Sequence, residues 1–98
     1  MKVENIRELQ NEFFETLKSI QDTSVYQALG EYNADESLED LLYNATYEAI
    51  TSICEMIDGY TNDKLKLDLV DVNSNVSLKE GIQMHDRCAD YLKWETKK

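Results

Sequence analysis

The chain has no proline and only three glycines, Gly30, Gly59 and Gly81, among its 98 residues. Sandwiches and barrels built only from strands depend on many turns rich in these two residues. Their scarcity argues against an all-β fold and favours helices. The length is that of one domain, residues 1–98, and a hydrophobic fraction of 42% is enough for a packed core.

Long apolar runs are also absent. No run approaches the roughly 18 residues that a membrane-spanning helix needs, and the first residues lack the basic and apolar pattern of a secretory signal. We therefore expect a cytoplasmic protein that does not contact membranes. In that compartment the only two cysteines, Cys54 and Cys88, are expected to be thiols.

Basic residues are missing from the middle of the chain. The net charge is −10, and residues 19–63 contain no lysine or arginine. A surface of this kind repels nucleic-acid backbones and attracts a protein with a basic surface. The alternative is a solvated face that only aids solubility. The segment holds ten acids: Asp22, Glu31, Asp35, Glu36, Glu39, Asp40, Glu48, Glu55, Asp58 and Asp63.

Apolar residues three and four positions apart predict helices over about 3–21 and 37–59. Between them, the capping residues Asp22-Thr23-Ser24 predict the start of a second, short helix over 24–32. Ser37 followed by Asp40 resembles a capping box for the long helix, and Gly59 fits the left-handed position at its end.

Residues 64–71 alternate leucines with polar residues, which predicts a strand. Three arrangements stay open for it: pairing with the same strand of a second copy, folding back onto 70–76, or lying as an extended arm over the helices. A turn is predicted at 73–75, and the capping box Ser77-Leu-Lys-Glu80 predicts a last helix over 77–95. The fold class is mainly α, a small bundle of three to four helices with one extended β segment near 64–71. A homodimer is compatible with this marginal size.

His85, Cys54 and Cys88 are the residues that would bind zinc or form a cysteine–histidine nucleophile pair. The pattern is weak, because there is no second histidine and no closely spaced cysteine pair. Asp86 follows His85 but points about 100° away on a helix, which makes it a poor orienting group. We therefore expect core roles for His85 and both cysteines, and no metal, cofactor or catalytic site.

Tyr43 and Tyr47 lie one turn apart on the long helix, close in sequence to its acidic first turn. Tyrosines on an exposed acidic face are good interface anchors, because they bury a large area at a small entropy cost. The alternative is that a central helix covers both rings within the core. The predicted partner-binding residues are Asp35, Glu36, Glu39, Asp40, Tyr43 and Tyr47.

Ile57-Asp-Gly-Tyr60, the alternating strand, and Leu78-Lys-Glu-Gly-Ile-Gln-Met-His-Asp86 with Tyr91-Leu92 carry a resemblance. Over about residues 50–93 the chain resembles small uncharacterised proteins from phages and mobile elements of Gram-positive bacteria. The resemblance implies an accessory protein of phage type and assigns no catalytic residue.

Together these observations favour a non-enzymatic, acidic protein-binding module. Its sharpest form is an inhibitor of a host protein, which mimics nucleic acid or blocks a basic surface and does not itself bind nucleic acid. Two alternatives stay open. One is a structural or assembly subunit of a phage or complex, and the other is a small metal-binding protein or enzyme that uses His85, Cys54 and Cys88.

Overall fold

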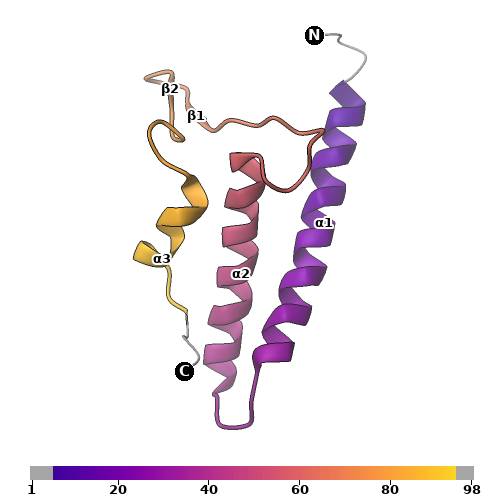
Figure 1. The fold of residues 1–98 in the computed structure, drawn as a ribbon, viewed down its shortest axis with the longest axis vertical. Coiled ribbons are helices and arrows are strands. Elements are labelled where there is room, and N and C mark those ends of the chain that lie inside the picture. The colour runs from indigo at the N-terminus through magenta and orange to yellow at the C-terminus, as the bar shows by residue number, and fades with distance from the viewer. Residues whose placement is uncertain (1–5, 95–98) are drawn as a thin grey trace.

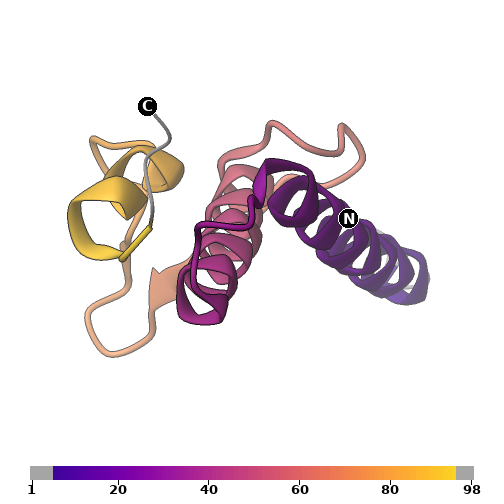
Figure 2. The same ribbon diagram turned by 90° about the horizontal axis from the view of Figure 1, so that it is seen from below.

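The computed structural model describes residues 6–94 and has a mainly helical fold, as the sequence predicts (Figure 1). Helices α1 (Ile6–Glu31) and α2 (Leu38–Asp58) form an antiparallel hairpin. The remaining chain forms strands β1 (Val70–Asp71) and β2 (Val76–Ser77), the 3-10 helix η2 (Met84–Arg87) and helix α3 (Cys88–Tyr91). Seen along the helices, α2 lies between α1 and the C-terminal segment (Figure 2).

Helix α1 is continuous, so the predicted break at 22–24 and the separate helix over 24–32 are wrong. Ser24 is only 3% exposed and belongs to the buried stripe of α1, which consists of Thr16, Ile20, Ser24 and Ala28. Small side chains in this stripe let the two helices approach closely, and this packing overrides the capping tendency of serine. Gly30 also lies inside the helix. Residues 3–5 of the predicted N-terminal helix lie outside the described residues.

Helix α2 begins and ends at the predicted signals. The Ser37 hydroxyl accepts a hydrogen bond from the backbone N–H of Asp40, with an N–O distance of 3.1 Å. Gly59 adopts the left-handed conformation at φ 98° and donates its N–H to the carbonyl of Met56. Both ends are therefore fixed by local chemistry.

The predicted strand over 64–71 is mostly an extended arm, which crosses the helices at one end of the hairpin (Figure 1). Leu65 is 2% exposed and packs with Ile20 and Met56. Asn62 holds the start of the arm, because its side-chain amide donates to Glu12 and Thr16 of α1. Only the last two residues pair, in a two-stranded antiparallel sheet that matches Val70 with Ser77 and Asp71 with Val76. The structure thus combines the extended-arm arrangement with a short fold-back.

The predicted helix over 77–95 is wrong over most of its length. The Ser77 hydroxyl donates to the carboxylate of Asp68 at 2.5 Å and also accepts from the N–H of Lys79, so it caps a turn. Gly81 then takes the left-handed conformation at φ 73°, which a helix interior does not allow. Helical structure starts only at Met84, and residue 95 lies outside the described residues.

The hydrophobic core is small and lies where the arm crosses the hairpin. Among the described residues only five hydrophobic side chains are buried, and they are Ile20, Ala28, Met56, Leu65 and Cys88. The molecule is elongated, with extents of 52 × 28 × 20 Å. Along the part of the chain that is described, neither long helix is sufficiently apolar to cross a membrane.

Candidate functional site

The acidic turn surface comprises the six predicted partner-binding residues, Asp35, Glu36, Glu39, Asp40, Tyr43 and Tyr47. It covers the connection between α1 and α2 and the first turns of α2. Asp35 and Glu39 are exposed, whereas Glu36 and Asp40 are half-buried. The connection is ordered by its own polar groups, because Glu36 accepts from the N–H of Asn33 at 3.1 Å and Asn33 accepts from the N–H of Asp35 at 2.9 Å. The acids are therefore presented on a defined turn.

The two tyrosines of this surface have different environments. Tyr43 is 38% exposed, and the Lys93 ammonium lies 4.6 Å from the centre of its ring. Tyr47 is half-buried and stacks on Trp94 with 5.1 Å between ring centres. The C-terminal segment therefore covers part of this helix face and brings one base to its margin. Tyr43 is the more exposed of the two tyrosines, although Lys93 lies over one face of its ring.

A shallow hollow of about 310 Å³ lies beside Tyr43. It is lined by Glu39, Leu42, Tyr43 and Thr46. The hollow combines an exposed carboxylate, an aromatic edge and an apolar side chain, the mixture that anchors a cationic side chain of a partner. It has the size of a subsite for one large side chain.

Three other acids of the hairpin, Glu31, Glu48 and Glu55, lie near enough to one another for their charges to interact. Burial raises the pKa of Glu48, and the charges of Glu31 and Glu55 raise it further. The negative potential of the central segment is thus concentrated on the hairpin, as its sequence indicates.

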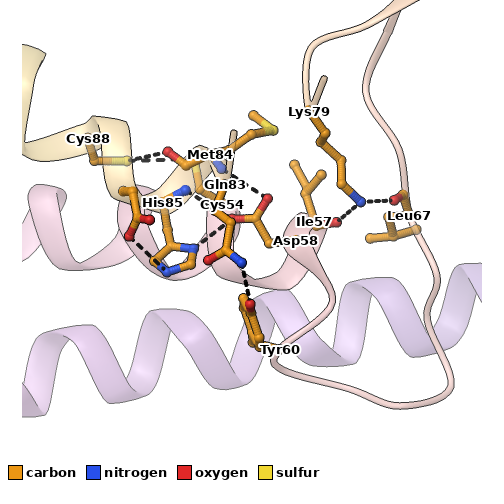
Figure 3. Close-up of polar contacts among 11 residues, drawn as sticks. Cys54, Ile57, Asp58, Tyr60, Leu67, Lys79, Gln83, Met84, His85 and Cys88 are labelled. Carbon is orange, nitrogen blue, oxygen red and sulfur yellow. Dashed lines mark hydrogen bonds and ion pairs between the residues drawn. The ribbon is translucent and has the colours of Figure 1, made fainter. Parts of the chain in front are cut away.

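His85 and Asp58 form a second polar cluster, far from the acidic turn surface in sequence (Figure 3). The Asp58 side chain is 3% exposed and accepts three hydrogen bonds, from the N–H groups of Met84 and His85, both at 3.0 Å, and from His85 Nδ1 at 2.6 Å. Burial acts to raise the pKa of Asp58, but these bonds outweigh it and lower the pKa. The bond to Asp58 raises the pKa of His85 against the opposing effect of burial, with a further contribution from Asp86.

The expectation that Asp86 points away from His85 is wrong. His85 Nε2 lies 3.4 Å from Asp86 Oδ1, although adjacent residues of a 3-10 helix leave its axis about 120° apart. Each ring nitrogen of His85 therefore faces a carboxylate. Tyr60 packs edge-on against the ring, and its hydroxyl accepts a hydrogen bond from Gln83. As predicted, His85 is partly buried, with its side chain 20% exposed.

Cys54 and Cys88 are brought together, with 3.7 Å between their sulfurs, and both are free thiols. Burial and the neighbouring Cys88 raise the pKa of Cys54 to about 11. A thiol with this pKa stays protonated near neutral pH and is a poor nucleophile and metal ligand. Within residues 6–94, no group of three or more His, Cys, Asp and Glu side chains is placed to hold a metal ion.

Asp58 and Lys79 are structural residues that the sequence patterns do not predict. The Lys79 ammonium donates to the carbonyls of Ile57 at 2.9 Å and Leu67 at 2.8 Å, so it joins the end of α2 to the arm (Figure 3). Helix α2 has no base in its own last turn, and Lys79 supplies the cation that its C-terminal carbonyls favour. One signal in the sequence was Asp58. It lies at the C-terminal end of a predicted helix, where the helix dipole disfavours a negative charge unless the carboxylate is hydrogen-bonded to another segment.

Comparisons with known proteins return no matching family model, no matching curated sequence and no matching solved structure.

Proposed function

We propose that this chain is a non-enzymatic, acidic protein-binding module whose acidic turn surface docks on a basic surface of a partner protein. The observation that carries the proposal is the exposure of Asp35 on an ordered turn and of Glu39 in the first turn of α2, next to the exposed Tyr43 and its hollow. No lysine or arginine lies between residues 19 and 63 to offset these charges.

In its sharpest form, the module is a cytoplasmic accessory protein of a phage or mobile element that inhibits a host protein. A rigid array of carboxylates occupies a groove that otherwise holds nucleic acid, because lysine and arginine side chains bind both kinds of anion. The raised pKa of the Cys54 thiol makes it a poor nucleophile near neutral pH, which supports a role without catalysis. This module does not bind nucleic acid directly, since the same charges repel phosphates.

The test is capture from a Gram-positive bacterial lysate with the immobilised chain, followed by mass spectrometry. The double variant Asp35→Lys and Glu39→Lys is compared with the control Glu8→Lys and Glu15→Lys, which reverses two exposed acids of α1. Each pair changes the net charge equally, so a difference between them reports position and not total charge. Glu36 is left intact because it bonds to the turn.

We expect the wild-type chain and the control to retain a basic protein at low salt that duplex DNA displaces, and the Asp35/Glu39 variant to lose it. Retention of the same protein by both variants, or failure of all forms to retain a basic protein, would contradict the proposal. Circular dichroism confirms that each variant is folded.

A further inference from the structure

An open groove runs along one side of the α1–α2 hairpin, with a volume of about 540 Å³. The open groove is lined mainly by Phe14, Leu17 and Val25 of α1 and by Ala45, Ala49 and Ile53 of α2. Phe14 is 63% exposed and Val25 is 46% exposed. Large apolar side chains therefore face solvent along a path between two long helices, where a folded monomer would normally cover them.

The lining of the open groove is almost free of charge. Lys18 is its only charged side chain, although the chain has 20 acids. A basic partner would bind more tightly to a groove lined by acidic side chains, and no acid lines this groove. A two-fold contact between identical copies brings each surface against itself, so like charges must be absent from its centre. The open groove meets this requirement, whereas the acidic turn surface does not.

The small core supplies the second reason for a partner. Within residues 6–94 only Ile20, Met56 and Leu65 form the buried core cluster, while many larger side chains are exposed. Chains of this length bury a modest share of their surface and are often stabilised by oligomerisation. A partner that completes the core must be present whenever the chain folds. A second copy of the chain meets this condition, because it is made in the same place.

The exposed apolar area along this side of the hairpin is similar in size to the apolar area that a homodimer interface buries. Leu29 follows Val25 by one turn of α1, and Leu38 and Leu42 continue the line of Ala45 along α2. With Phe14 and Val25, these side chains are between 46% and 66% exposed. Taking roughly 200 Å² for a fully exposed large side chain, they offer on the order of 500 Å² of apolar surface per copy. A standard interface buries about 800 Å² per partner, roughly 65% of it apolar in homodimers.

We propose that the open groove is closed by the same groove of a second copy, so that two hairpins form a four-helix bundle about a two-fold axis. Ala45 and Ala49 in the floor of the groove allow the helices of the two copies to pack closely. The dimer presents two acidic turn surfaces. The proposal does not depend on the proposed function, because its driving force is apolar burial and not charge, although Thr46 lines both the groove and the hollow beside Tyr43, and Leu42 lines that hollow.

The test is sedimentation equilibrium of the wild-type chain, of Val25→Glu in the groove and of the control Val76→Glu. Val76 lies in β2 and is 51% exposed, close to the 46% of Val25, so the two variants differ mainly in place. We expect wild type and Val76→Glu to sediment at twice the 11.4 kDa chain mass. For Val25→Glu we expect the mass of one chain, because two buried carboxylates would face each other.

Val25→Glu tests the groove only if it folds, so a second measurement uses the wild-type chain alone. A homodimer requires its melting temperature to rise with protein concentration. A wild-type monomer with a constant melting temperature would overturn the proposal. So would a dimer that survives Val25→Glu, or an open-ended assembly larger than two copies, which would make the groove part of a polymeric contact.

Discussion

Asp58 occupies a position where an acid normally weakens a helix, the last turn of α2. Its carboxylate is stable there because three donors converge on it from residues 84 and 85. Those bonds begin the 3-10 helix and attach the C-terminal segment to α2. One buried side chain thus determines where two elements meet.

The Asp58–His85 pair gives folding a defined pH dependence. The pKa of His85 is raised above its ordinary 6.5, so its contribution to stability is full below that pH and is lost as pH rises through the raised value. The pKa of Asp58 is lowered below 3.8, so its contribution is full above that pH and is lost as pH falls through the lowered value. We expect the pair to stabilise the fold most between these two limits.

Urea unfolding across this range checks the prediction. The unfolding free energy should fall as pH rises through the raised pKa of His85, and His85→Gln should remove most of that fall. Equal pH dependence in wild type and His85→Gln would show that the ion pair does not stabilise the fold.

Lys79 is a second residue whose contribution to stability depends on a few hydrogen bonds. Replacing it by methionine keeps the apolar stem and leaves the carbonyls of Ile57 and Leu67 without its ammonium. We expect Lys79→Met to lower the unfolding free energy by about 1–2 kcal/mol. The control Lys66→Met, at an exposed position, should change it by less than about 0.5 kcal/mol. Chemical denaturation that gives equal losses for both would refute the assigned role.

At the scale of elements, two glycines differ in conformation and therefore in what an added methyl group does. Gly30 is helical, and nothing lies within 4 Å of an added Cβ. Gly59 has φ +98°, which strains any residue with a side chain. We expect Gly30→Ala to stabilise the fold by about 0.5–1 kcal/mol and Gly59→Ala to destabilise it by about 1–2 kcal/mol.

Thermal melts of the two variants measure this contrast. A destabilised Gly30→Ala would mean that α1 ends before Gly30. A neutral Gly59→Ala would mean that α2 does not end in a left-handed cap.

The sequence signals predicted an element correctly where the contacts that define it are made by neighbouring residues. Ser37 and Gly59 define α2 because their caps involve only neighbouring residues. Ser24 and Ser77 misled the prediction because their environments are tertiary: Ser24 packs against α2, and Ser77 bonds to Asp68. No periodic pattern in a single sequence encodes such contacts.

The same distinction applies to the candidate sites. The sequence placed the acids of the turn correctly on a connection and a helix start, because their order along the chain is enough. It did not predict the bond between Asp58 and His85, which are 27 residues apart. Nor did it predict that Trp94 covers Tyr47 while Tyr43 stays more exposed.

At the scale of the whole molecule, two surfaces of the hairpin have opposite character. The acidic turn surface suits a basic partner, and the open groove suits a second copy. Both arise from the same shortage of internal packing: an elongated hairpin with a small core leaves much of its surface for contacts. The charge keeps the acidic surfaces of different copies apart, while the nearly uncharged groove lets two copies meet.

The central claim, that the acidic turn surface binds a basic protein, is tested most directly by the salt dependence of that affinity. Isothermal titration of the captured protein with wild-type chain should show affinity that falls steeply as salt is raised, because exposed charges are screened. Asp35→Lys with Glu39→Lys should bind more weakly and with a shallower salt dependence. Wild-type affinity that does not change with salt, or equal affinity in the variant, would contradict the account.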